Sequence, residues 1–513
     1  MAIATKEQSV VDAVPKGVYI GGEWRDASGG KTLAVEDPAT GETLCEVADA
    51  TPEDAKAAID AAAGAQADWA AHPPRERGEI LRRAFEEMTA RADELALLMT
   101  LEMGKAVKES KAEISYAAEF LRWNAEQAVR IDGRYATAPN GAGRLLTMKQ
   151  PVGPCLLITP WNFPAAMGTR KIGPAVAAGC TMVVKPAKLT PLSMLALAQI
   201  LENAGLPAGV LNVVTAASAS SVTAPVIEDP RLRKLSFTGS TEVGRKLIEQ
   251  SAPNVLKLSM ELGGNAPFLV FEDADLDAAV EGAMIAKLRN VGEACTAANR
   301  FHVAAPIADE FADRLAERMR GLKVGRGTED GVDIGPLVDA DTRDKVAELV
   351  EDALAKGAEA LVDGGDDGSA RRGDASADGS ASGGHAATGR LDGPGYFYAP
   401  TVLKGVTPDA RALKEEIFGP VAPVIAFDSE DDAIAAANDT ELGLVAYLYT
   451  RDFKRAMRVC EALETGMVGL NQGIVSNPAA PFGGVKQSGF GREGGYEGIE
   501  EYLETKYVAV NLD

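Results

Sequence analysis

Cys295 is the residue of this sequence best suited to nucleophilic chemistry. It ends the segment Arg289-Asn-Val-Gly-Glu-Ala-Cys295, where a predicted helix gives way to a loop. A thiolate in a polar, partly open setting is a strong nucleophile, whereas most cysteines are small buried hydrophobes. The neighbours of Cys295 are small or polar, namely Gly292, Glu293, Thr296 and Asn299. The other cysteines lie in or beside apolar runs, as expected for buried side chains: Cys45, Cys155, Cys180 and Cys460.

A cysteine nucleophile needs a group that accepts a proton, and the three histidines are poor candidates. His302 lies in an alternating run that favours a strand with this side chain facing outward. His72 lies in a helix linker and His385 in a Gly-rich stretch. Glu261, in Met260-Glu-Leu-Gly-Gly-Asn265, is the better candidate, because a carboxylate can activate either a thiol or a water molecule.

Asn162 stands in a stiff segment, Thr159-Pro-Trp-Asn-Phe-Pro164, directly after an apolar strand. Proline fixes the backbone dihedral φ on both sides of it, so the side-chain amide is presented in one direction. A rigidly held amide donor can stabilise the negative oxygen of a tetrahedral intermediate. Taken alone, the residue is more readily explained as a turn asparagine.

Two further strand ends carry groups that suit a phosphate. Lys185-Pro-Ala-Lys188 places two cations after one strand, and Phe237-Thr-Gly-Ser-Thr-Glu-Val-Gly244 forms a strand, a turn and a helix start. Lysine binds phosphate as a point charge, and free N–H groups at a helix N-terminus attract anions. Solvated lysines would explain the first pattern equally well, and the G-x-G-x-x-G fingerprint is absent.

The elements that must position these groups alternate along the chain. From Val152 on, short apolar strands alternate with helices, and a second alternating block runs from about Ala266 to Val468. This pattern predicts an α/β fold with parallel, doubly wound sheets. Ligands of such sheets bind at the carboxyl ends of the strands, where the segments above fall. The strands expected in the first block are 154–158, 181–185, 210–214 and 235–238.

The remaining segments predict helices and β arms. Residues 17–24 have the pattern of a hairpin, Thr51 that of a helix N-cap, and 75–130 that of two or three helices. Residues 131–150 and 502–511 have strand character outside the main cores, and such arms offer an edge for pairing between subunits. The stretch 364–395 is Gly, Asp, Ser and Ala with almost no large apolar residue, so nothing in it predicts packing.

Composition excludes several classes of protein. The 513 residues include 52 basic and 75 acidic ones, which gives a formal charge of −23 and disfavours a nucleic-acid partner. Hydrophobic residues at 46% are typical of a globular enzyme, and no apolar run reaches the ~18–20 residues of a membrane span. The scattered histidines indicate no metal site. We expect a cytoplasmic protein, and the acid excess favours a salt-adapted, halophilic one.

Taken in order, these segments resemble the aldehyde dehydrogenase superfamily. The resemblance runs from about residue 17 to residue 510, and seven motifs in sequence order are far more specific than any one of them. The motifs are Thr159-Pro-Trp-Asn-Phe-Pro164, Lys185-Pro186, Phe237-Thr-Gly-Ser240, Glu261-Leu-Gly-Gly264, Cys295, Glu416-Ile-Phe-Gly-Pro420 and Pro481-Phe-Gly-Gly484.

The resemblance implies an aldehyde dehydrogenase-like fold of two doubly wound α/β domains and a β oligomerisation arm. The NAD(P)-binding domain would comprise residues 13–129 and 151–262, and the catalytic domain residues 263–465. Residues 130–150 would form the first part of the arm, and 466–513 a return segment and the rest of the arm. Such a protein is expected to be a homodimer or homotetramer.

The resemblance also implies a role for each site residue. Cys295 would attack the aldehyde carbonyl to give a thiohemiacetal, Asn162 and the Cys295 N–H would hold the oxyanion, and hydride would pass to the nicotinamide. Glu261 would then activate the water that hydrolyses the thioester. The implied cofactor-binding residues are Thr159, Pro160, Trp161, Lys185, Lys188, Gly239, Ser240, Gly263, Glu416 and Phe418.

Within the superfamily the likeness is greatest to succinate-semialdehyde dehydrogenases, whose matching Arg170, Arg289 and Ser476 would bind the distal carboxylate of the substrate. Arginine suits this role because its planar fork is always charged. The substrate would then be succinate semialdehyde or a close ω-semialdehyde acid. A longer oxo acid such as 2-oxoglutarate semialdehyde is an alternative. From another enzyme class, a cysteine thioester hydrolase would share the nucleophile and need no nicotinamide.

Several positions depart from the common pattern of the family, and two of them bear on cofactor choice and regulation. Lys188 stands where NAD-preferring relatives carry an acid, and exchanging an acid for a cation favours NADP while leaving NAD possible. Ala297 stands where some relatives carry a second cysteine, so we expect no regulatory disulfide.

Overall fold

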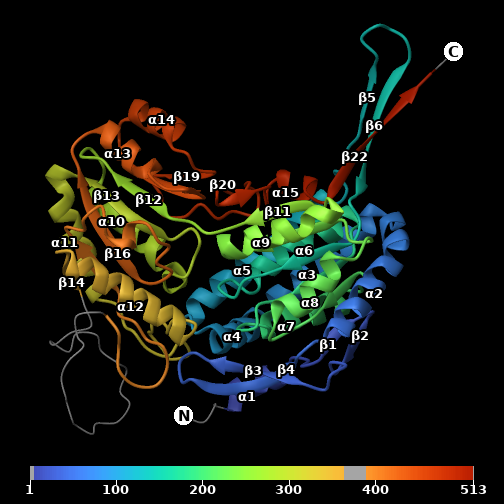
Figure 1. Cartoon of the computed structure of the whole chain (residues 1–513), viewed down its shortest axis with the longest axis horizontal. Helices are drawn as coiled ribbons and strands as arrows, with labels where there is room; N and C mark the ends of the chain where they lie inside the picture. The colour runs from blue at the N-terminus through green and yellow to red at the C-terminus, as the bar shows by residue number, and fades with distance from the viewer. Residues whose placement is uncertain (1–4, 363–388, 512–513) are drawn as a thin grey trace.

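Two large sheets and one slender three-stranded sheet form the framework of the protein (Figure 1). The structure is a computed structural model, and it describes residues 5–362 and 389–511. Most of the Gly-rich stretch 364–395 lies outside the described residues.

The first sheet has eight strands in the order β2-β1-β9-β8-β7-β10-β11-β21. Its centre, from β9 to β11, is parallel, which confirms the predicted doubly wound arrangement. The two edges of the sheet are antiparallel, because the hairpin of β1 and β2, predicted at residues 17–24, and the short β21 join it antiparallel. The strands are β1 Val18–Ile20, β2 Glu23–Arg25, β7 Cys155–Ile158, β8 Met182–Lys185, β9 Leu211–Val213, β10 Lys234–Thr238, β11 Lys257–Glu261 and β21 Gly489–Phe490.

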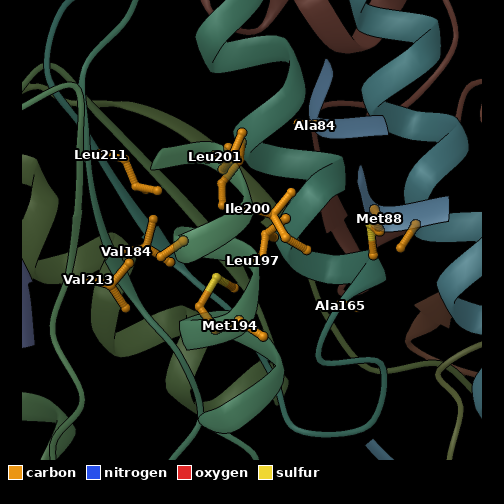
Figure 2. Close-up of a cluster of buried hydrophobic side chains, with 14 of the residues drawn as sticks. Ala84, Met88, Ala165, Val184, Met194, Leu197, Ile200, Leu201, Leu211 and Val213 are labelled. Carbon is orange, nitrogen blue, oxygen red and sulfur yellow. The ribbon is translucent and has the colours of Figure 1, made fainter. Parts of the chain in front are cut away.

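Helices cover both faces of this sheet, so every second side chain of a strand enters a different core. Leu157 of β7 packs with α6 and α7, whereas its neighbours Leu156 and Ile158 pack with α2 and α8. Figure 2 shows part of the first core, where Leu197 and Ile200 of α7 lie near Val184 and Val213 of the sheet. The covering helices are α2 Pro52–Ala71, α6 Ala166–Ala178, α7 Leu192–Asn203, α8 Ala219–Ile227 and α9 Thr241–Ser251.

The first third of the chain contributes helices that pack on α6 and α7. The capping box expected at the start of α2 is present, since Thr51 Oγ1 accepts from Asp54 N and Asp54 accepts from Thr51 N. Residues 75–130 form three helices. The helices outside the sheet are α1 Thr5–Asp12, α3 Pro74–Ala90, α4 Ala92–Met103 and α5 Val107–Gln127. One antiparallel pair was not predicted, although its first strand alternates exposed and buried residues: β3 Thr32–Asp37 and β4 Glu42–Ala48.

The second sheet has seven strands in the order β14-β15-β16-β13-β12-β18-β19, all parallel except the edge strand β14. Its two faces carry separate apolar cores. The strands are β12 Ala266–Val270, β13 Ala298–Ala304, β14 Glu359–Val362, β15 Thr401–Lys404, β16 Val421–Phe427, β18 Val445–Tyr449 and β19 Met467–Leu470. The helices are α10 Leu276–Leu288, α11 Ala308–Arg320, α12 Ala340–Ala355, α13 Glu430–Asn438 and α14 Phe453–Ala462.

The two predicted β arms pair with each other. β22 Leu503–Val510 runs antiparallel to β6 Arg144–Pro151, which also pairs with β5 Arg134–Thr137. This sheet projects from the rest of the molecule in Figure 1. A short pair, β17 Leu442–Gly443 and β20 Val485–Lys486, and the helix α15 Glu497–Glu500 complete the elements near the site.

Among the described residues no helix is long and apolar enough to cross a membrane. The same residues contain no group of three or more His, Cys, Asp or Glu side chains that could hold a metal ion.

Candidate active site

Most of the predicted site residues line one cleft. It lies at the carboxyl ends of β7, β10 and β11, and the loop after α10 closes it from the second sheet. Its lining includes Pro160, Trp161, Asn162, Arg170, Gly239, Ser240, Glu261, Gly263, Arg289, Cys295, Glu416, Phe418 and Ser476. Thr159 and Lys185 lie buried just behind this lining, where Thr159 N donates to Lys185 O, and Lys188 is exposed.

The loop that carries Cys295 has an unusual backbone. Asn290, Val291 and Gly292 are consecutive left-handed residues, with φ values of 57°, 59° and 81°. Such conformations cost roughly 1–3 kcal/mol per non-glycine residue and persist only where the surrounding structure holds them. The loop is packed directly against the end of β11, because a Cβ on Gly264 would lie 2.1 Å from the carbonyl oxygen of Cys295.

Asn162 is held between the first sheet and this loop. It is buried at the start of α6, and its Nδ2 donates to the carbonyl oxygen of Glu293 at 2.9 Å. An amide nitrogen carries two hydrogens, so the second is available to a ligand in the cleft. Lys105, which follows α4, holds the same segment because its Nζ donates to Asn162 O at 2.9 Å. The same ammonium forms a buried ion pair with Glu113.

Glu261 is the last residue of β11 and is 2% exposed. Neither carboxylate oxygen has a hydrogen-bond partner among the described residues. Burial, reinforced by the charge of Glu493, raises the pKa of Glu261 well above its ordinary value, and Arg170 and Lys171 oppose this effect. Its raised proton affinity and free oxygens make Glu261 suited to accept a proton from a substrate or a water molecule.

The Cys295 thiol also has a raised pKa. Burial raises its pKa to about 12, against the positive charge of Arg170, which favours the thiolate. The nucleophile is therefore formed only as its proton leaves, which makes a nearby proton acceptor necessary. Of the other cysteines, Cys155 and Cys180 are buried as predicted, while Cys45 and Cys460 are half-buried.

His302 cannot serve as that acceptor. The prediction that it faces outward was wrong, because β13 is a central strand covered on both faces, and His302 is 6% exposed. Burial and the charge of Arg300 lower its pKa to about 3.

Two arginines flank the cleft, and they differ in their partners. Arg289 Nη1 donates to Ser476 Oγ at 2.9 Å, and its guanidinium lies 4.9 Å from the centre of the Phe163 ring. No described carboxylate forms an ion pair with Arg289. Arg170 is 1% exposed, stacks on Phe482 at 4.1 Å and is ion-paired with Glu493, which also binds Lys171.

Several lining residues were missed by the sequence analysis. Tyr116 has a buried hydroxyl without a partner among the described residues, and the centre of its ring lies 5.7 Å from the Arg289 guanidinium. The periodicity of α5 marks this residue only as part of an amphipathic helix. Glu493 was also missed; it does not line the cleft but binds Arg170, and it follows the Pro481-Phe-Gly-Gly484 motif outside every pattern considered. The other missed residues of the lining are Phe163, Met167, Thr238, Leu262, Thr296, Thr342, Lys345 and Phe482.

The wall formed by β8, β10 and β11 fits a dinucleotide. Lys185 is 5% exposed, and no described residue hydrogen-bonds to its ammonium; burial and the charge of Lys188 lower its pKa to about 8. A buried cation in this state is stabilised by an anion or by ribose hydroxyls. The N-terminus of α9, capped by Ser240, offers free N–H groups at the end of β10.

Glu416 and Phe418 complete this wall. Glu416 Oε1 accepts from Gly264 N at 3.1 Å, and a Cβ on Gly263 would lie 3.1 Å from its other oxygen. Burial raises the pKa of Glu416 to about 7. Phe418 has a φ of 54°, rare for a bulky residue, and its ring meets Trp161 edge-on at 5.4 Å. The strained aromatic residue thus faces the cleft between the two sheets.

Known proteins are similar in sequence to this chain over nearly their whole lengths. A succinate-semialdehyde dehydrogenase of Paenarthrobacter nicotinovorans is 57% identical over 467 residues, which cover 91% of this chain and 98% of the relative. An NADP(+) succinate-semialdehyde dehydrogenase of Escherichia coli strain K12 is 50% identical over 493 residues, 96% of this chain and 97% of the relative. A glutarate-semialdehyde dehydrogenase of Pseudomonas putida is 50% identical over 494 residues, with the same two shares.

Solved structures and family patterns agree with these relatives. The crystal structure of a succinate-semialdehyde dehydrogenase from Burkholderia pseudomallei superposes with a TM-score of 0.91 at 49% identity, covering 98% of this chain and 99% of that one. The pattern of the aldehyde dehydrogenase family matches residues 24–379 and 370–508. With its cysteine, carboxylate and amide gathered in one cleft between two α/β sheets, the chain belongs to the aldehyde dehydrogenase family.

Proposed function

We propose that the enzyme oxidises succinate semialdehyde, or a close ω-semialdehyde acid, to the corresponding carboxylate. One observation carries the substrate assignment: Arg289 lines the same cleft as Cys295 and is bound by a neutral serine rather than by a carboxylate. An uncompensated cation inside a protein of charge −23 supports an anionic substrate that brings its own carboxylate. Tyr116 and Phe163 around the guanidinium favour a chain of a few methylene groups.

The first half of the reaction forms a bond between Cys295 Sγ and the aldehyde carbon. As Glu261 takes the thiol proton and passes it to solvent, the sulfur bonds to the carbonyl carbon, and the carbonyl oxygen becomes negative and accepts from Asn162 Nδ2. Arg170 lowers the cost of the negative charge around Cys295, because it is close enough to favour the thiolate. A bound NAD(P) would supply the acceptor for the hydride that leaves this carbon, which would leave Cys295 as a thioester.

The second half of the reaction belongs to Glu261. Its carboxylate takes a proton from a water molecule, the water oxygen bonds to the acyl carbon, and the C–S bond breaks to release the acid and the thiol. The raised pKa of Glu261 makes it a stronger base than an ordinary carboxylate once it is ionised. Lys171 and Arg170, both bound to Glu493, limit how far that pKa rises.

The cofactor is NAD(P), and we propose that NADP is preferred. Lys185, Gly239, Ser240, Gly263 and Glu416 would hold it along the wall described above, together with Thr159, Pro160, Trp161 and Phe418. Lys188 supports the preference, because its exposed ammonium stands close enough to Lys185 to lower the pKa of that group. A second cation beside a ribose favours a 2′-phosphate.

A substrate panel tests this proposal. Purified enzyme is assayed with succinate, glutarate and 2-oxoglutarate semialdehydes and with butanal, each with NAD and with NADP. We expect the highest kcat/KM for succinate semialdehyde with NADP, and no activity in Cys295→Ala. Preference for a five-carbon acid would move the assignment to the glutarate-type relatives. Hydrolysis of a succinyl thioester without any reduction of NAD or NADP would instead support the hydrolase.

We also propose that the β arm pairs with a second copy of this chain. Its strands expose large apolar side chains, with Tyr135 67% and Tyr507 58% accessible. Light scattering should give a dimer or a tetramer, and removal of residues 503–513 should leave monomers.

A further inference from the structure

Asn290 connects the loop that carries Cys295, residues 289–295, to the segment that carries Asn162 through hydrogen bonds. Its side chain is fully buried, and Nδ2 donates to Asn162 O at 3.0 Å and to Glu293 O at 2.9 Å. Asn162 Nδ2 donates to the same Glu293 carbonyl. Asn162, Asn290 and Glu293 therefore form a closed ring of hydrogen bonds two residues before Cys295.

We propose that Asn290 is a positioning residue, which fixes the oxyanion-binding amide of Asn162 relative to the Cys295 sulfur. This proposal rests on the roles given to Asn162 and Cys295 in the proposed function. Asparagine suits the position for two reasons. It tolerates the left-handed backbone, with φ at 57°, and its amide group carries two hydrogens for two carbonyl acceptors.

The surroundings leave Asn290 little freedom. Its backbone N–H donates to Glu109 Oε2 at 2.6 Å on helix α5, and its carbonyl oxygen accepts from Glu293 N at 2.9 Å. Two carbonyl acceptors beside one end of the amide also fix which end is the nitrogen. The loop is thus tied to α5 through the backbone and to Asn162 through the side chain, so the two ties can be separated by substitution.

Asn290→Gly removes the side-chain tie alone. Glycine accepts a positive φ without strain, and the backbone bonds to Glu109 and Glu293 persist. Each carbonyl that loses Asn290 keeps one partner, because Asn162 O still accepts from Lys105 and Glu293 O from Asn162. The variant is therefore expected to fold. Asn290→Asp offers a second variant of the same shape that lacks the NH2 donor.

Two reactions of Cys295 that need neither semialdehyde nor cofactor test the proposal. Acyl transfer from p-nitrophenyl acetate develops an oxyanion, whereas alkylation by iodoacetamide does not. We expect Asn290→Gly to slow acyl transfer by roughly 10- to 100-fold, less than the ~10²–10³ expected for loss of the donor itself in Asn162→Ala. Alkylation should stay within about twofold of the wild type, since no oxyanion is involved.

Asn471→Gly is the matched control. Asn471 also has a positive φ, 52°, and its amide bonds both backbone groups of Thr450 outside the cleft. Both reactions should proceed in this variant at the wild-type rate. Because the two experiments use no succinate semialdehyde, failure of the substrate assignment would not affect them.

A double-mutant cycle separates positioning from a general structural effect. If Asn290 acts through Asn162, the Asn162→Ala and Asn290→Gly double variant should acylate no more slowly than Asn162→Ala alone. The proposal is overturned if Asn290→Gly and Asn290→Asp acylate at the wild-type rate, if alkylation falls as far as acylation, or if the two substitutions are additive. Loss of folding in both Asn290 variants, seen as absence of a thermal transition, would assign the residue to stability and also overturn it.

Discussion

Replacing Arg289 by methionine should separate recognition of the substrate carboxylate from the chemistry at Cys295. Methionine keeps much of the apolar stem that packs against Phe163 and Tyr116, but it removes the charge and the donor to Ser476. A hydrogen bond to a charged group contributes roughly 1.5–3 kcal/mol, and a half-buried arginine in this cleft lies toward the upper end. About 3 kcal/mol corresponds to a loss of roughly 10²-fold in kcat/KM for succinate semialdehyde.

Butanal provides the reference, because it has the same chain length and no carboxylate. Its kcat/KM should change by less than about threefold in Arg289→Met, because butanal forms no ion pair with the guanidinium in either the ground state or the transition state. Ser476→Ala should lower kcat/KM for succinate semialdehyde roughly five- to tenfold. The double variant should lose less than the product of the two single losses in kcat/KM, because Arg289 binds Ser476. An equal loss on both aldehydes would show that Arg289 supports the loop rather than the substrate, and would refute the assignment.

Four further outcomes follow from the charges of the site and the surface. Glu261→Gln should accumulate the Cys295 thioester, detected by mass spectrometry, and should lose the rise in deacylation rate that the wild type shows as pH climbs through the raised Glu261 pKa. Lys188→Glu should raise KM for NADP by up to roughly tenfold and lower that for NAD, as expected for one exposed charge contact. The buried Glu293 carboxyl also has a raised pKa, caused by burial, so the stability it contributes is complete below its unfolded pKa and lost as pH rises through its folded pKa. Glu293→Gln should therefore show a higher Tm than the wild type at alkaline pH in calorimetry, and no difference near pH 4. Because the net charge is −23, Tm should rise with KCl between about 0.1 and 1 M, where the Debye length shrinks from ~10 to ~3 Å, and a flat dependence would count against the halophilic interpretation.

Contacts between residues that are far apart along the chain could not be predicted from the sequence. Alternating strands and helices identified the sheet edge where Asn162 and Glu261 lie, because strand ends in a doubly wound sheet face the same side. Cys295 was predicted from the change of a helix into a polar loop, and the structure places it in the loop before β13. Glu493 was not predicted, since its partner Lys171 is 322 residues away and no periodicity links them. Asn290 stood within the quoted loop, yet its left-handed backbone and its two acceptors depend on segments that only the folded chain brings together.

The two arginines of the cleft show why residue types alone could not assign separate roles to the residues of the site. Both suit a carboxylate, and both were assigned to it. In the folded protein Arg170 already has its anion, because Glu493 binds it in a region where an unpaired charge would be costly. Its remaining effect is electrostatic, on the Cys295 thiol and the Glu261 carboxyl. Arg289 has only Ser476, so a substrate carboxylate there completes an ion pair without breaking one. We therefore expect Arg289 to set the preference for acidic aldehydes and Arg170 to set the proton affinities on which the chemistry depends.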